Sequence, residues 1–152
     1  MHPDGYFALV LAPESAALLK ATFATLANPI AHHCTVCYGT CNPANLPAVF
    51  SPSDLGRTFL LQVTGFATRA DGGVQAAVVA LLLPDGSRVD HGFSRNAIPH
   101  ITVATDGVVE PVTANALLAG GFDPRPDGPL LRATLVHARA SSSQPITGAD
   151  ST

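Results

Sequence analysis

Two long apolar runs in the middle of the chain constrain its fold more than any other feature. The segments "TFLLQVTGFATR" (58–69) and "VQAAVVALLL" (74–83) are separated only by "ADGG". A short turn with Asp and Gly between two apolar runs is typical of a β-hairpin. We therefore expect two paired antiparallel strands at the centre of the fold.

The flanking segments predict further strands and a small amount of helix. Helical spacing of apolar residues in "AALLKATFATLA" predicts a helix over 16–27. The other predicted elements are strands at 6–11, 31–39, 100–105 and 129–140 and a short helix within 110–121. Strands dominate and the hairpin favours antiparallel pairing, so the predicted class is α+β. Residues 1–140 are expected to form one domain, and the small polar residues of 141–152 a flexible C-terminal tail.

Charge and hydropathy exclude several classes of protein. Apolar residues make up 47% of the chain and charged residues 12%, which excludes a disordered chain. The net charge is −3 and Lys20 is the single lysine, so no basic stripe is present for gripping long nucleic acid. A nucleic-acid ligand would have to be short or a chain end. No apolar run approaches the ~20 residues of a membrane helix, and the start lacks the positive region of a signal peptide.

The cysteines lie in one window, as Cys34, Cys37 and Cys41, next to His32 and His33. Such ligand types suit zinc or iron–sulfur sites, but the second pair of ligands that a zinc ribbon needs is missing. Residues three apart in a strand point to opposite faces, so Cys34 and Cys37 are not expected to chelate one ion. We expect buried apolar cysteines, no metal site, and a reducing compartment such as the cytoplasm.

One pattern occurs twice, as His33-x-Thr35 and as His100-x-Thr102, each followed by Val in a predicted strand. Residues two apart in a strand share a face, so each strand would present an imidazole beside a hydroxyl. If the two strands lie side by side, four such groups converge. Hydrolysis of a phosphodiester needs a base, an acid and donors for the non-bridging oxygens, and this set supplies all three. With unperturbed pKa values near 6.5, one imidazole could be neutral and the other protonated at neutral pH. Strict alternation places the neighbouring His32 on the opposite face.

The paired motifs "HCTV" and "HITV" resemble the signature of the two-histidine (2H) phosphoesterase superfamily. "YFALVL" before a helix, and "PHITVAT" before "GVVEPVTANALL", are similar to the cyclic phosphodiesterase domain of fungal-type tRNA ligases. The resemblance spans residues 6–137. It implies a bilobal fold in which two antiparallel sheets face each other across a cleft, with one motif on each lobe.

The resemblance also implies a reaction. It implies hydrolysis of 2′,3′-cyclic phosphates on RNA ends or mononucleotides to 2′-phosphates. We expect a monomer that uses no metal or cofactor. Carried over to this chain, His33 and His100 are the acid–base pair, and Thr35 and Thr102 bind the phosphate. Similar enzymes suggest that His100 activates water and that His33 protonates the leaving 3′-oxygen, a direction that the sequence alone leaves open.

Three further residues are candidates for substrate binding. Tyr38 would lie near the mouth of the cleft and could stack on a base. Arg95 and Asn96, in the loop that enters the second motif, could meet phosphate or ribose. Alternative functions are cleavage of 2′,5′-linked oligoadenylates, trimming of RNA 3′ ends, and binding of an RNA end or nucleotide without turnover.

Overall fold

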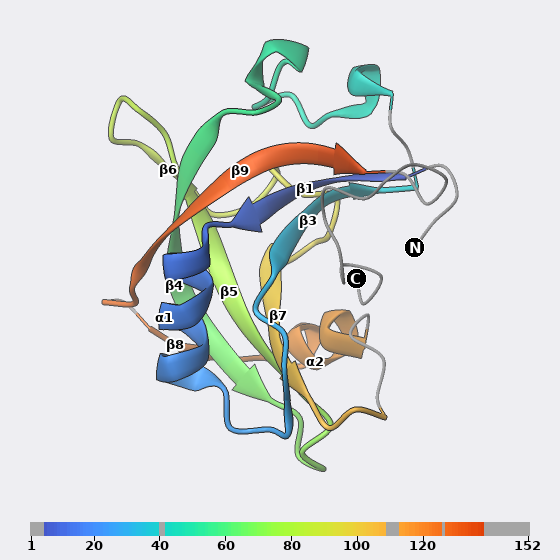
Figure 1. Cartoon of the computed structure of the whole chain (residues 1–152), viewed down its shortest axis with the longest axis vertical. Coiled ribbons are helices and arrows are strands. Elements are labelled where there is room, and N and C mark those ends of the chain that lie inside the picture. Colours follow the sequence, from blue (N-terminus) through green and yellow to red (C-terminus); the bar gives the residue numbers. More distant parts are fainter. Residues whose placement is uncertain (1–4, 40–41, 109–112, 126, 139–152) are drawn as a thin grey trace.

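A single antiparallel sheet that closes on itself forms the body of the molecule (Figure 1). The structure is a computed structural model, and it describes residues 5–39, 42–108, 113–125 and 127–138. The strands are β1 (Tyr6–Leu11), β2 (Asn28–Pro29), β3 (His33–Tyr38), β4 (Thr58–Thr68), β5 (Val74–Leu82), β6 (Arg88–Val89), β7 (His100–Thr105), β8 (Asp123–Pro124) and β9 (Leu130–Ala138).

Six of these strands make a closed barrel. Hydrogen bonding follows the order β7-β3-β1-β9-β4-β5, and a further antiparallel pairing of β5 with β7 closes the ring. The three short strands β2, β6 and β8 are additions to it, pairing with β7, β5 and β4. The predicted hairpin is confirmed, since β4 and β5 pair along most of their length, with Leu61 opposite Leu81.

The prediction of a bilobal α+β fold is wrong. A bilobal molecule would need two separate sheets, whereas here the hairpin joins the rest of the chain at both of its edges. The outer edge of β4 pairs with β9, and that of β5 pairs with β7. The two motif-bearing strands, β3 and β7, consequently belong to one continuous sheet and not to two facing lobes.

The interior of the barrel holds the main hydrophobic core. Alternation in each strand sends every second side chain inward, where it loses contact with water. The buried inward residues include Phe7 and Leu9 of β1, Cys34 and Val36 of β3, Leu61 and Val63 of β4, Val79 and Leu81 of β5, Ile101 and Val103 of β7, and Leu131 and Leu135 of β9. The intervening residues of β3 and β7 therefore project outward.

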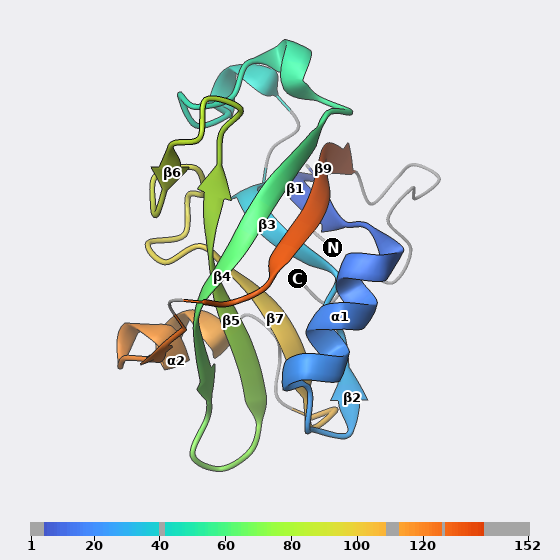
Figure 2. The same cartoon turned by 90° about the vertical axis from the view of Figure 1, so that its left-hand side faces the viewer.

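Within the described residues, α-helix is confined to two short elements. Helix α1 (Pro13–Phe23) packs beside β9 and β7 and places Leu19 in the core (Figure 2). It ends earlier than the predicted helix, because the backbone and the hydroxyl of Thr25 are hydrogen-bonded to the side chain of buried Gln75. Helix α2 (Ala114–Ala119) packs on the outer faces of β5 and β4.

Two further predictions concern the C-terminal tail and membrane-spanning helices. The proposed C-terminal tail, 141–152, lies outside the described residues. Neither described helix has the length and apolar character that crossing a membrane would require.

Candidate active site

The two motif strands are neighbours in the sheet. Cys34 of β3 is the antiparallel partner of Ile101 of β7, and both side chains are fully buried in the barrel core. The residues on either side of this pair therefore face outward together. Antiparallel geometry sets His33 across from Thr102 and His100 across from Thr35.

The flanking strands continue this outward surface on both sides. On β1, Val10 pairs with His33 and Ala8 with Thr35. On β5, Val78 pairs with His100 and Ala76 with Thr102. Each histidine and threonine thus lies in the middle of a four-stranded surface whose other members are small or apolar. In such a ladder, diagonal neighbours like His33 and His100 have Cα atoms about 7–8 Å apart.

His100 has one ring nitrogen occupied. The backbone of the loop places the carbonyl of Ile98 2.8 Å from His100 Nδ1, and a carbonyl can only accept, so Nδ1 carries a proton. In the neutral ring, Nε2 then has a lone pair free to accept a proton. Only 7% of the residue is exposed, and this burial lowers the pKa of His100, against a smaller opposing effect of the Ile98 hydrogen bond.

His33 is held differently. Its Nδ1 lies 3.0 Å from Nδ1 of His32, and the ring of Tyr6 on β1 packs beside it with centroids 5.7 Å apart. Burial lowers the pKa of His33 to about 3, and repulsion from His32 and His100 contributes in the same direction. Both imidazoles are therefore neutral at pH 7 in the unliganded protein, which differs from the expectation of one neutral and one protonated ring.

The threonines are more accessible than the histidines. Thr35 and Thr102 are both partly exposed, and neither hydroxyl makes a hydrogen bond within the described part of the chain. Both hydroxyls can therefore donate to a ligand placed on this surface.

The secondary candidates lie around β3, at differing distances from the motifs. Tyr38 is exposed, and its ring packs on Tyr6, which in turn packs on His33, so it borders the site. Arg95 donates its backbone N–H to Val36, but its guanidinium is bonded to the carbonyl of Asn45. The structure therefore brings Arg95 to the edge of β3 without turning its charge toward the histidines.

The loop that carries Arg95 and Asn96 supports the first motif through a residue that the sequence did not single out. The hydroxyl of buried Ser94 donates to the carbonyl of Thr35 at 2.7 Å and accepts from the backbone N–H of Asn96 at 3.1 Å. Ser94 thus gives the Thr35 carbonyl the hydrogen bond that a neighbouring strand would otherwise donate, at the point where β3 and β7 move apart. The backbone N–H of Asn96 helps to hold this loop through its hydrogen bond to Ser94.

Cys34 and Cys37 are buried as predicted, but not on opposite faces of the strand. Cys34 and Cys37 are free and buried, as expected for apolar cysteines, and Cys41 lies outside the described residues. They share one core and do not point to opposite faces, because a β-bulge opposite Phe7 and Ala8 shifts the alternation. In the described part of the chain, no three His, Cys, Asp or Glu side chains are grouped so that they could hold a metal ion.

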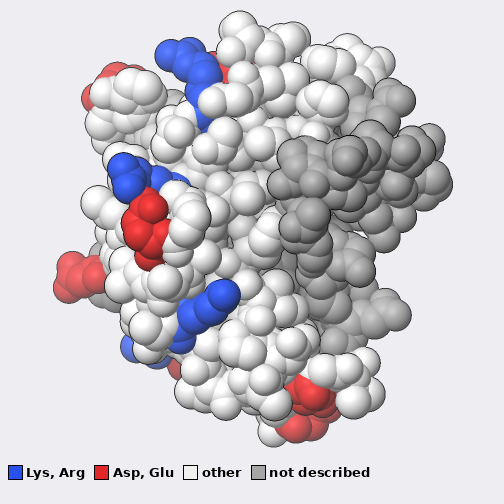
Figure 3. Space-filling model, viewed as in Figure 1, with Lys and Arg blue, Asp and Glu red and all other residues white. Residues whose placement is uncertain are grey.

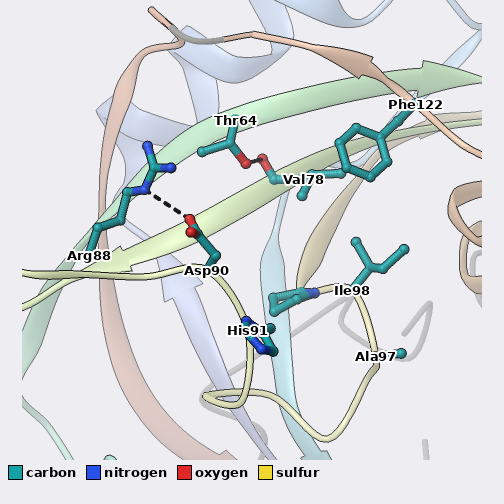
Figure 4. A pocket seen from close by; sticks show the side chains of 9 residues that line it. Thr64, Val78, Arg88, Asp90, His91, Ala97, Ile98 and Phe122 are labelled. Carbon is teal, nitrogen blue, oxygen red and sulfur yellow. Dashed lines mark hydrogen bonds and ion pairs between the residues drawn. The ribbon is translucent and has the colours of Figure 1, made fainter.

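A surface pocket borders the site. A pocket of about 310 Å³ lies over β4 and β5, and its walls include Val78, Ile98 and Pro99, which adjoin His100, as well as Phe122 (Figure 4). On its far side, Arg88 and Asp90 form an ion pair of 2.8 Å. Over the face in Figure 3, basic and acidic side chains are scattered, and no continuous basic patch is visible there.

His32 and Tyr6 are the two site neighbours that sequence reasoning missed. Tyr6 shares the outward face of β1 with Ala8 and Val10 and pairs with Tyr38 in the register, but its ring reaches back to His33, with centroids 5.7 Å apart. His32 was assigned to the opposite face by alternation, and that assignment fails because Ala31 has a positive φ of 44°. A comparison of the chain with protein-family models finds no match, and a comparison with curated proteins finds none either.

Proposed function

We propose that this protein hydrolyses 2′,3′-cyclic phosphates by acid–base catalysis between His33 and His100. The observation that carries the proposal is the shared outward face of the two His-x-Thr pairs, fixed by the pairing of Cys34 with Ile101. Two imidazoles and two hydroxyls that meet on one surface match the needs of an in-line displacement at phosphorus.

The different partners of the two Nδ1 atoms favour different roles. His100, with Nδ1–H held by the Ile98 carbonyl, offers Nε2 as a base to an attacking water. The Nδ1 of His33 lies against the Nδ1 of His32, which can accept a hydrogen bond from a protonated His33 ring. This partner makes His33 the better candidate for the acid. This assignment agrees with the direction that the family resemblance implies.

The reaction then balances with one water. The water oxygen forms a bond to phosphorus as its proton passes to His100 Nε2, and the bond from phosphorus to O3′ breaks. O3′ takes a proton from His33 Nε2, leaving a 2′-phosphate and a free 3′-hydroxyl. Thr35 and Thr102 donate hydrogen bonds to the non-bridging oxygens, where negative charge builds up.

Substrate binding favours uptake of a proton from solvent by the acid, His33. His33 is neutral in the free protein, but a phosphodiester anion beside it favours the charged ring. We therefore propose that the substrate binds together with a proton. One chain carries both motifs, which is compatible with a monomer, and the net charge of −3 is compatible with mononucleotides or RNA ends as substrates.

The test is direct. Purified protein is incubated with each of the four 2′,3′-cyclic mononucleotides, with and without EDTA, and the products are separated into 2′ and 3′ monophosphates. We expect 2′-monophosphates in both conditions. Hydrolysis of a 2′,5′-linked dimer, but of no cyclic mononucleotide, would show that the enzyme cleaves a different phosphodiester bond. Binding of 2′-AMP without turnover of any substrate would show that the site binds nucleotides without catalysis.

A further inference from the structure

His32 and His33 form a directly bonded pair of imidazoles. Their Nδ1 atoms are 3.0 Å apart, and the rings meet edge to face, with an interplanar angle of 81° and centroids 5.2 Å apart. Both Nδ1 atoms cannot accept, so one of them carries the shared proton. Since Nδ1 of His33 is occupied in this way, its Nε2 is the nitrogen left for a ligand.

The backbone before the pair is in a strained conformation that directs His32 toward His33. Ala31 has a φ of 44°, in the left-handed region that costs a residue with a Cβ roughly 1–2 kcal/mol. Hydrogen bonds from Ile30 to Val103 and from Ala31 to Thr102 hold this turn against β7, and Leu11 donates to the carbonyl of His32. Such strain persists only where the surroundings determine it, and it occurs often at functional sites.

We propose that His32 is a positioning residue for the acid step, accepting the Nδ1 proton of His33 whenever that ring is protonated. The inference rests on the proposed function, in which His33 is the acid. With His32 as acceptor, the imidazolium of His33 is held in one orientation, and its second proton, on Nε2, points to the leaving oxygen.

The surroundings of the pair limit it to one added proton. The groups facing the pair are His100 from β7, Tyr6 from β1 and Lys20 from α1, and Tyr38 lies beyond Tyr6. Burial and, to a smaller extent, the positive charge of Lys20 lower the pKa of His32, and the two imidazoles repel when both are charged. The pair therefore holds at most one added proton, and a bound phosphate attracts that proton to His33.

The experiment compares two replacements of His32 with a control. In His32→Asn, the side-chain oxygen can take the place of Nδ1 as acceptor, whereas His32→Leu fills the space without accepting. His137→Ala removes an exposed histidine of β9, away from the pocket beside His100. For turnover of 2′,3′-cyclic AMP, we expect His32→Leu to lower kcat by about tenfold or more, and His32→Asn to recover most of it. We also expect the alkaline limb of the profile of kcat against pH to move to lower pH in His32→Leu alone.

A second readout does not depend on turnover. In the complex with 2′-AMP, nitrogen NMR of His33 should show both ring nitrogens protonated at pH 6 in wild type and in His32→Asn, but not in His32→Leu. Equal kcat and equal pH profiles in the two variants, or unchanged His33 signals in His32→Leu, would overturn the role of His32. If wild type turns over no cyclic phosphate but the NMR difference is found, the proposed hydrolysis fails while the pairing of His32 with protonated His33 stands.

Discussion

Cys34 and Ile101 face each other across β3 and β7, and this one pair of buried side chains determines where both catalytic candidates project. Because both side chains fill the barrel interior, their strand neighbours must turn outward. The arrangement of His33 with His100 thus depends on a core contact and not on a contact of their own.

Removing either imidazole should abolish most turnover. We expect His33→Gln and His100→Gln each to lower kcat for a 2′,3′-cyclic mononucleotide by about 10²–10⁴-fold, since each loses one proton transfer. The measurement is steady-state kinetics beside circular dichroism, and His137→Ala is the matched control. Retained activity in both variants would show that the reaction uses other groups.

Replacing the threonines should weaken the transition state without removing proton transfer. Thr35→Val and Thr102→Val keep the shape of the side chain but lose a donor to an anionic oxygen, which contributes about 1.5–3 kcal/mol. We expect kcat/KM to fall by roughly 10–150-fold in each case. Thr134→Val, on the outward face of β9, is the control. An effect in the control as large as in the motif variants would point to a general loss of packing.

We expect kcat/KM to be highest at acidic pH. Burial lowers the pKa of both rings below 6.5, so His33 and His100 are both neutral above that pH in the free protein and the substrate must bind together with one proton. Because protons become scarcer as pH rises, we expect kcat/KM to decline with pH throughout the range above 6.5. A plateau extending from pH 7 to pH 9 would contradict this.

The free energy of unfolding should fall as pH falls, whereas kcat/KM should rise. His33 has a pKa of about 3 in the folded protein and near 6.5 in the unfolded chain, so between these values the unfolded state binds more protons. Its contribution lowers the free energy of unfolding by about 1.4 kcal/mol for each pH unit as pH falls through that window. Urea unfolding at pH 7 and pH 5 measures it, and His33→Gln should show a smaller decrease than wild type.

The position of Cys34 offers a check on the inward face. Burial raises the pKa of the Cys34 thiol to about 12, so the native protein should leave it unmodified by a thiol reagent at pH 8. We expect labelling at this residue, followed by mass spectrometry, only when urea unfolds the protein. Rapid labelling of native Cys34 would mean that β3 presents the other face to solvent.

Local elements of the fold could be predicted from the sequence, because their signals are local. The strand at 6–11 and the β4–β5 hairpin follow from apolar runs and a turn, and both are confirmed. Closure of the barrel could not be predicted, since the β5–β7 pairing joins segments whose apolar patterns fit many partners. The family resemblance led instead to two facing lobes.

Within the site, the pattern predicted the motif residues but not their supports. Alternation puts His33 and Thr35 on one face because β3 is regular from His33 to Thr35. It fails one residue earlier, where the positive φ of Ala31 turns His32 toward His33, and again at the bulge that places Cys37 in the core. Neither irregularity has a Gly or Pro signal in the sequence.

The central claim, that His33 and His100 flank one phosphorus atom, is tested most directly by titrating ¹⁵N-histidine-labelled protein with 2′-AMP. We predict that the ring-nitrogen signals of both residues shift along one common saturation curve, and that the Nε2 signals move most. Shifts confined to one of the two histidines, or two curves with separate midpoints, would contradict the account.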